Sequence, residues 1–225
     1  VIKKGCAVEG DDALNIHLTN SRNSQGVLMD NESANLALFA NRFSSIVGEM
    51  GAILQRTSFS VNVKERVDFS CAMLDADGRL VVNAPHIPVH LGSMGLCVRS
   101  VAKQLPMEEG DVIITNHPKY GGSHLPDITL ISPVFHEGKC VAYVANRAHH
   151  AEIGGKTPGS MPPDATTLQE EGVVFSPGYL LRNGKAYWKE IEDKLTEGPY
   201  PSRSPEENIA DLQGALASIQ SGVRQ

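Results

Sequence analysis

Histidine is concentrated in the middle of the chain. Five of the eight histidines lie between residues 117 and 150: His117, His124, His136, His149 and His150. Two acids, Asp127 and Glu152, lie close to them in the sequence. Imidazole and carboxylate groups are the usual protein ligands of zinc, manganese and iron. The stretch therefore predicts a metal site, with ligands drawn from separate loops and strands.

The segment His124-Leu125-Pro126-Asp127 is one candidate half of such a site. It places an imidazole three residues before a carboxylate, and the proline disfavours a helix there. Two glycines just before it, Gly121 and Gly122, allow a sharp bend. We expect a rigid turn that holds His124 and Asp127 together. The alternative is a loop whose His and Asp simply bond to backbone.

The adjacent pair His149-His150 is the other candidate half. The pair follows a predicted strand, and neighbouring side chains on an extended segment point to opposite faces. Only one of the two is therefore expected to bind a metal, while the other supports it or acts as an acid or base. His136 is expected in a hairpin turn, and His117 is expected to support the site from outside.

Two further segments carry possible site residues. In PHIPVHLG two prolines remove backbone donors, which predicts an irregular loop rather than a helix. His86 and His90 in this loop are then either pocket-lining or structural. In KERVD, Glu65 and Asp68 are candidates for a further ligand or a base, or are simply solvated acids.

Hydrophobic periodicity and turn residues predict an α+β fold, with mixed or antiparallel β hairpins and packed helices, as the N-terminal part of a larger domain. Two hairpins turn at Asp75-Ala76-Asp77-Gly78 and Asn183-Gly184. The predicted helices cover 33–56, 93–105 and the segment from Pro205 to the end. The predicted strands cover 67–74, 79–82, 111–115, 128–135 and 140–146, with a long loop over 154–172 and the second hairpin over 173–190.

Composition limits the class of protein. The net charge of −6 and the pI of about 5.7 argue against nucleic-acid binding, which needs a clustered basic face. No apolar run approaches the ~20 residues that span a bilayer, and no signal peptide is recognisable. The four cysteines form no CxxC pair, as expected of reduced thiols in a cytoplasmic protein. No phosphate-binding GxxxxGK[ST] or GxGxxG motif is present, so nucleotide chemistry has to come from another domain or subunit.

Three long segments carry a family resemblance over residues 33–225. They are QRTSFSVNVKERVDFSCAMLDADGRLVVNAPHIPVHLGSM, NHPKYGGSHLPDITLISPVF, and VANRAHHAEIGGKTPGSMPP followed by LQEEGV. The chain resembles the hydantoinase B/5-oxoprolinase family, and most closely the module fused behind the ATP-handling half of 5-oxoprolinases. Residues 1–32 lie outside the resemblance, as a linker or the end of a preceding region. The family's subunit is longer, so the domain is expected to be truncated at its C-terminus. The family's usual RGHHADIGG is here RAHHAEIGG.

The resemblance implies an ATP-dependent hydrolase of cyclic amides, which converts 5-oxoproline to glutamate, as in glutathione metabolism, or opens a hydantoin ring. A partner of the hydantoinase A type uses ATP and Mg, and this module carries a divalent metal (Zn, Mn or Fe). A small-molecule substrate and an oligomeric assembly are expected, with no membrane partner. The implied metal ligands are His124, Asp127 and His149 or His150, of which we choose His150, and Glu65 is the candidate fourth ligand. His149 and Asp68 are the expected catalytic groups, and Asn116, Arg147 and Lys156 are expected to hold substrate or phosphate oxygens.

Two rival functions remain open at this point. The first is a subunit of an acetone- or acetophenone-type carboxylase, a branch of the same family that also uses ATP. The second is a non-catalytic assembly module with a structural metal. An open coordination position indicates catalysis, whereas a closed site with four protein ligands indicates structure.

Overall fold

The computed structural model describes residues 6–10, 16–20, 31–83 and 87–225, and His86 lies outside them. The chain divides into two compact units, Val1–Arg42 and Phe43–Gln225. The described part of the first unit contains an antiparallel hairpin of β1 (Cys6–Gly10) and β2 (Ile16–Asn20), followed by the first part of α1 (Asn31–Thr57). The sequence analysis did not predict this hairpin.

The second unit is built on a seven-stranded antiparallel sheet in the order β4-β3-β7-β6-β5-β8-β9. The strands are β3 (Phe69–Asp75), β4 (Leu80–Asn83), β5 (Val112–Thr115), β6 (Asp127–His136), β7 (Lys139–His149), β8 (Gly178–Arg182) and β9 (Lys185–Ala186). Hairpins turn at the two predicted places, and Asn183 and Gly184 both adopt positive φ, as a two-residue turn requires. The expected α+β class with antiparallel hairpins is confirmed.

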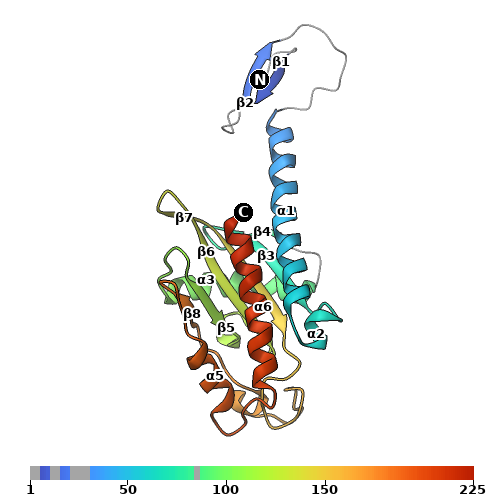
Figure 1. Cartoon of the computed structure of the whole chain (residues 1–225), viewed down its shortest axis with the longest axis vertical. Coiled ribbons are helices and arrows are strands. Elements are labelled where there is room, and N and C mark those ends of the chain that lie inside the picture. Colours follow the sequence, from blue (N-terminus) through green and yellow to red (C-terminus); the bar gives the residue numbers. More distant parts are fainter. Residues whose placement is uncertain (1–5, 11–15, 21–30, 84–86) are drawn as a thin grey trace. The chain divides into compact units, whose positions relative to one another are not determined.

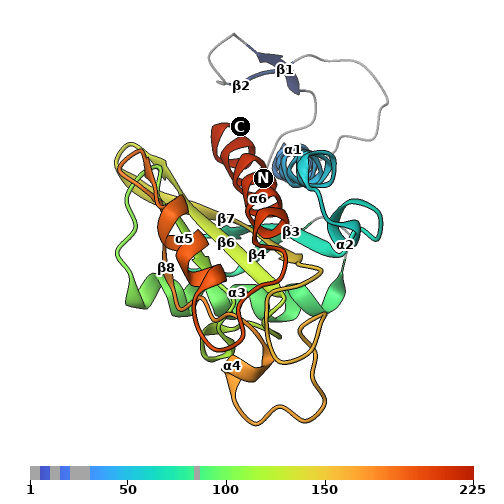
Figure 2. The same cartoon turned by 60° about the horizontal axis from the view of Figure 1, so that its bottom comes forward.

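Helices pack on both faces of this sheet. Besides the second half of α1, the described part of this unit contains α2 (Val61–Lys64), α3 (Pro88–Gln104), η1 (Pro118–Tyr120), α4 (Leu168–Glu171), α5 (Trp188–Thr196) and α6 (Pro205–Arg224). Figures 1 and 2 show α6 lying across one face, beside the second half of α1, with α3 on the opposite face. Strand β3 shows why both faces are covered: Phe69 and Cys71 pack in the core under α6, whereas Ala72 and Leu74 pack in the core under α3.

The N-terminus of α3 differs from the prediction. We expected an irregular loop through residue 92, but the helix begins at Pro88. Proline is favourable at the first helical position, because its missing N–H would have no partner there and its φ is already helical. The consequence is that His90 sits in the first turn of a helix. The short helix α5 was also not predicted; it packs through Ile191 and Leu195.

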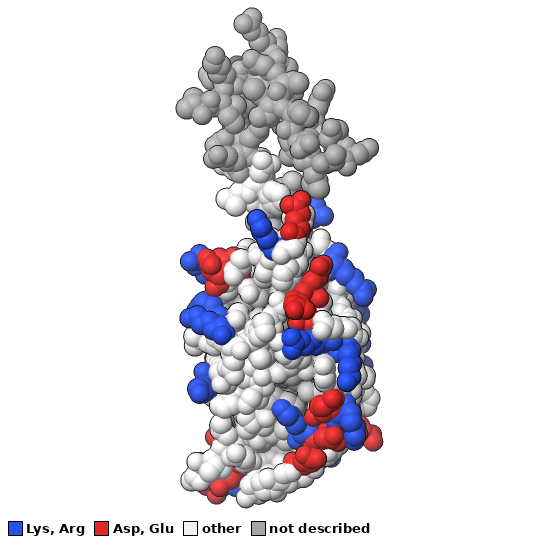
Figure 3. Space-filling model, turned by 90° about the vertical axis from the view of Figure 1, so that its left-hand side faces the viewer, with Lys and Arg blue, Asp and Glu red and all other residues white. Residues whose placement is uncertain are grey.

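The surface of the second unit has no dominant charge on the side drawn in Figure 3. Acidic and basic side chains lie among one another there, around a broad area that carries neither. Nucleic-acid-binding proteins instead concentrate Lys and Arg in a stripe. Among the described residues, no helix is long and apolar enough to cross a membrane.

Candidate metal centre

The centre forms where β6 begins and β7 ends. These two strands are antiparallel neighbours, and their register places Asp127 directly opposite His149. The backbone of Asp68, just before β3, is tied to the same place because the N–H of His149 donates to its carbonyl at 3.0 Å. Three segments far apart in the sequence therefore meet at one end of the sheet.

The carboxylate of Asp127 is the middle of the group. Its Oδ1 lies 3.0 Å from Nδ1 of His149, and its Oδ2 lies 3.1 Å from Nδ1 of His124. The rings of His124 and His149 are 4.8 Å apart between centroids. One ligand atom from each of the three residues lies within 4.8 Å of the others. The expected turn does hold His124 and Asp127 together, since the N–H of Asp127 donates to the carbonyl of His124.

Further polar groups surround this carboxylate. Nε2 of His90 lies 3.3 Å from Asp127 Oδ2, and Ser123 donates its hydroxyl to the same oxygen. Asp68 lies farther out, with its carboxylate oxygens 3.9 Å from His90 Nε2 and 4.0 Å from His149 Nδ1. Asp127 is buried, whereas 31% of the Asp68 side chain is exposed. Asp68 thus faces both the imidazoles and solvent.

Electrostatics keep Asp127 ionised. Burial by itself raises the pKa of a carboxyl, but hydrogen bonds from His124, His149, His90 and Ser123 outweigh it and hold the pKa of Asp127 far below its usual range. The hydrogen bond to Asp127 in turn raises the pKa of His124, against the opposing effect of burial. A buried anion surrounded by imidazoles is an environment suited to a divalent cation.

The donor set fits such a cation. Carboxylate oxygen and imidazole nitrogen bind zinc and its neighbours at about 2.0–2.2 Å, which places ligand atoms about 3.4 Å apart around a tetrahedral ion. The observed separations of 3.0 and 3.1 Å from Asp127 to the two histidines are close to that spacing. If these three residues bind a tetrahedral ion, one position is left free, as in catalytic rather than structural zinc sites.

A pocket of about 420 Å³ opens onto the group. It is lined by Arg66, Asp68, Ile87, His90, His124, His149 and Met161. His124 is 37% exposed and His149 14% exposed, so both ligand candidates are accessible from it. The arrangement therefore favours a reaction site over a closed structural site.

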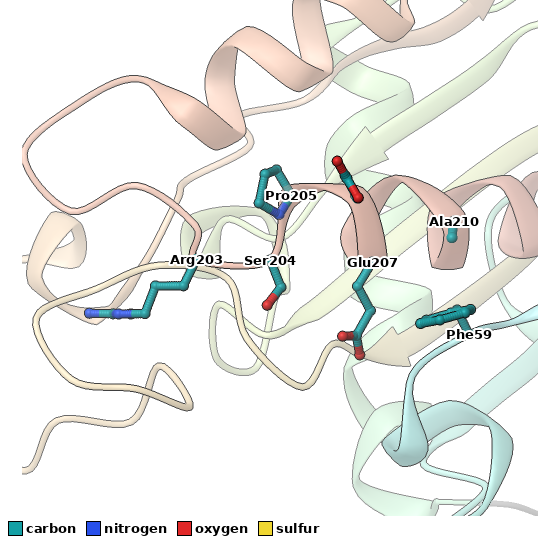
Figure 4. A pocket seen from close by; sticks show the side chains of 7 residues that line it. Phe59, Arg203, Ser204, Pro205, Glu207 and Ala210 are labelled. Carbon is teal, nitrogen blue, oxygen red and sulfur yellow. The ribbon is translucent and has the colours of Figure 1, made fainter.

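A larger pocket, of about 560 Å³, lies at the start of α6. In Figure 4 the ring of Phe59 lies beside Ala210 and Glu207, while Arg203 extends away from them. The guanidinium of Arg203 is held by Glu152 at 2.7 Å and by the carbonyl of Gly155 at 2.7 Å. No member of the histidine–aspartate group lines this larger pocket, so it is not part of the candidate metal centre.

A model of the family described as Hydantoinase B/oxoprolinase matches residues 32–225. The chain belongs to this family. It is 48% identical over 199 residues to 5-oxoprolinase 1 of Arabidopsis thaliana, a match that covers 84% of this chain and 16% of that protein. It is 44% identical over 221 residues to the 5-oxoprolinase of Saccharomyces cerevisiae, covering 94% of this chain and 17% of that protein.

The fold is similar to a solved structure of the ATP-dependent caprolactamase from Pseudomonas jessenii, with a TM-score of 0.75. The two chains are 30% identical, and the match covers 87% of this chain and 33% of that one. The chain thus spans about one-sixth of the length of the two 5-oxoprolinases. The match to the yeast protein covers 94% of this chain, which is more than residues 32–225 make up. This match therefore includes part of the segment before residue 32.

The adjacent side chains of His149 and His150 point to opposite faces at the end of β7, as the extended backbone requires. His149 belongs to the group, whereas His150 is buried on the other side, where Asn208 Nδ2 lies 3.2 Å from its Nδ1. Burial lowers the pKa of His150 to about 4. We expected His150 as the ligand and His149 as the base, but the structure brings His149, not His150, to His124 and Asp127.

Glu65 is also outside the group. It is an exposed residue at the end of α2, where its N–H donates to the carbonyl of Val61. His90 is the residue that sequence reasoning left undecided. Pro88 could have been recognised as the first residue of a helix, and this would have predicted His90 in the first turn of that helix.

The three expected substrate-binding residues hold the protein itself together. The side-chain amide of Asn116 donates to the carbonyls of Leu125 and Val173 and accepts from the N–H of Phe175. Lys156 pairs with Asp164 at 3.0 Å and Glu170 at 3.4 Å, which closes the long loop after β7. Neither side chain lines the pocket of the histidine–aspartate group.

Arg147 is completely buried and links four segments. Its guanidinium donates to the Thr129 hydroxyl at 2.8 Å, the Ser93 hydroxyl at 2.5 Å and the Gly121 carbonyl at 2.8 Å, with a longer contact of 3.5 Å to the carbonyl of His90. Those segments carry His90 and the loop before His124. Arg147 therefore holds α3 and the loop before His124 in place against β6 and β7.

The acid that follows the histidine pair also serves a neighbouring loop. Glu152 accepts from the N–H of Gly154, from the N–H and guanidinium of Arg203, and from the hydroxyl of Ser202. Glu152 thus ties the turn after β7 to the segment before α6. It does not line the pocket of the histidine–aspartate group.

Proposed function

We propose that this chain carries the metal centre of an ATP-dependent hydrolase of cyclic amides, with 5-oxoproline as the first substrate to test. The observation that carries the proposal is the group of His124, Asp127 and His149, open to a pocket. The relatives support it, since two are named 5-oxoprolinases and a third is named an ATP-dependent caprolactamase. Each of these names describes an enzyme that acts on a lactam.

Coupling to ATP makes chemical sense for this substrate class. A lactam carbonyl is a poor electrophile, and transfer of the γ-phosphoryl group to its oxygen makes the carbon reactive. Water then adds to that carbon and the C–N bond breaks, which leaves an acyl phosphate. A second water hydrolyses this acyl phosphate, so that lactam, ATP and two waters give the amino acid, ADP and phosphate. The phosphoryl transfer belongs to a hydantoinase A-type partner half, because this chain has no phosphate-binding motif.

His124, Asp127 and His149 are the proposed ligands of a divalent metal. When bound, such an ion acts as a Lewis acid and lowers the pKa of water from 15.7 towards about 7. The donor set suits zinc, manganese and iron alike. His90 and Ser123 hold the carboxylate of Asp127 in place from outside this group.

Asp68 is the proposed general base. It lines the pocket and is partly exposed. Its carboxylate oxygen Oδ2 lies 4.0 Å from Nδ1 of His149. It can therefore accept a proton from water in the pocket and pass it to solvent. His149, which we first expected to be the base, becomes a ligand in this proposal.

The test uses the full-length protein together with its ATP-handling part. Metal analysis of the purified protein and ATP-dependent opening of 5-oxoproline are measured for the wild type and for His124→Ala and Asp127→Ala. We expect both variants to lose the metal and the activity while retaining the fold by circular dichroism. A metal-free protein with full activity, or variants that hydrolyse normally, would overturn the proposal.

A substrate panel separates the related activities. The panel contains 5-oxoproline, hydantoin, caprolactam, and acetone with bicarbonate, and ADP release is measured for each. ADP release with a cyclic amide supports the hydrolase. ADP release only with acetone and bicarbonate would assign the chain to a carboxylase instead.

A further inference from the structure

Arg66 lines the same pocket as Asp68 and carries the opposite charge. It is exposed, and among the described residues no carboxylate forms an ion pair with it. Other arginines are engaged: Arg147 by hydroxyls and carbonyls, Arg203 by Glu152, and Arg79 by Asp75 and Asp77. Arg66 is thus a cationic residue of the pocket that no carboxylate of the described residues neutralises.

The backbone beside Arg66 is strained. Val67 has a φ of +57°, a left-handed conformation that is rare for a β-branched residue. Such strain persists only where the surroundings impose it, and it collects at binding and catalytic sites. Here the anchors on both sides are visible: the N–H of Arg66 donates to the carbonyl of Val61, and the N–H of Asp68 donates to that of Asn62.

The strained residue lies between two pocket residues, Arg66 and Asp68. Asp68 is fixed further by the bond from its carbonyl to the N–H of His149. The turn at Val67 therefore positions a cation and an anion at the rim of the pocket, and the anion faces His90 and His149. Ile87 and Met161 supply apolar lining in the same pocket. A small ligand with an aliphatic body and an oxyanion matches this lining.

We propose that Arg66 binds an oxyanion of the substrate, either the carboxylate of a carboxylated lactam or the phosphoryl group on the activated carbonyl. The inference rests on the proposed function, because it assigns a substrate class to the same pocket. A guanidinium matches both groups, since its planar fork pairs with two oxygens at once. The site then selects anionic over neutral lactams, or anionic intermediates over their precursors.

The experiment compares Arg66→Gln with Arg66→Lys and with the matched control Arg79→Gln, which removes an exposed arginine from the β3–β4 turn. The full-length protein with its ATP-handling part is assayed with 5-oxoproline, and 2-pyrrolidone, which lacks the carboxylate, is added as a competitor. Metal content is measured for every variant. Loss of one charged hydrogen-bonding partner is expected to cost about 10- to 100-fold in kcat/KM.

The two sources of the oxyanion give different results. If Arg66 binds the carboxylate, Arg66→Gln raises KM for 5-oxoproline and leaves inhibition by 2-pyrrolidone unchanged. If it binds the phosphoryl group, Arg66→Gln lowers kcat with little change in KM. In both cases Arg66→Lys recovers part of the loss and Arg79→Gln has no effect.

An Arg66→Gln protein with kcat and KM within about twofold of the wild type would overturn the inference. That result leaves the proposed function standing as long as His124→Ala abolishes activity. Conversely, a wild-type protein with no ATP-dependent lactam hydrolysis refutes the proposed function and this inference with it.

Discussion

Asp127 Oδ1 lies 3.0 Å from His149 Nδ1, and the two residues are direct partners in the register of β6 and β7. Side chains alternate between the faces of a strand, so a slip of one residue would place a different side chain opposite Asp127. On this chain the neighbours are Ala148 and His150. The register thereby decides which histidine of the pair joins the centre.

The first prediction separates the two adjacent histidines. His149→Ala is expected to weaken metal binding by more than about 100-fold, because even residues that only orient a ligand contribute about 10- to 100-fold. His150→Gln, which can keep the bond to Asn208, is expected to retain the metal. Metal content after dialysis against a weak chelator measures both. Loss of metal from His150→Gln alone would contradict the assignment of His149.

The second prediction concerns the buried Arg147. Arg147→Met is expected to lower the free energy of unfolding by about 3–5 kcal/mol, because the hydroxyls of Thr129 and Ser93 and the carbonyl of Gly121 lose their donor. Arg147→Lys keeps the charge and should lose less. Urea denaturation measures the change. Arg56→Met, at an exposed position, is the control, with an expected change below about 0.5 kcal/mol.

The third prediction is a pH dependence of stability at Glu152. Burial raises the pKa of this carboxyl, but the bonds from Arg203, Ser202 and Gly154 outweigh it, so the folded pKa is lowered. The stabilisation is therefore present above the unfolded pKa of about 4.5 and is lost as the pH falls through the folded value.

Glu152→Gln tests this dependence. Its free energy of unfolding should lie about 1–3 kcal/mol below that of the wild type at neutral pH, and the gap should narrow as the solution is made acidic. Urea denaturation across the acidic range gives both curves. A gap that stays constant with pH would show that the carboxylate charge makes no contribution.

The fourth prediction uses two helical glycines. A Cβ at Gly222 in α6 would overlap the sulfur of Met50 in α1, whereas a Cβ at Gly48 in α1 meets nothing. Gly222→Ala is therefore expected to destabilise the protein by about 1–3 kcal/mol. Gly48→Ala should stabilise it by about 0.5–1 kcal/mol, because alanine favours helix. Thermal denaturation of the pair checks the signs, and equal shifts would disprove close packing of the two helices at Gly222.

Local patterns in the sequence determined much of the fold. The apolar periodicity from Pro205 predicted α6, and Asn183-Gly184 predicted the turn between β8 and β9. These features follow from interactions between residues near one another in the chain, which a single sequence displays. The His124–Asp127 turn was predictable for the same reason, since a proline and two glycines define its backbone.

The composition of the centre needed tertiary structure. The alternation of side chains on a strand showed that His149 and His150 face opposite ways, but only the pairing of β6 with β7 decided which of them meets Asp127. His90 reaches the same carboxylate from α3, and Glu65 does not reach it at all. The role of Arg147 likewise became visible only in the structure, where its guanidinium binds β6, α3 and the loop at Gly121. Contacts between distant segments arise from packing and register, and the sequence by itself determined only the residues available to make them.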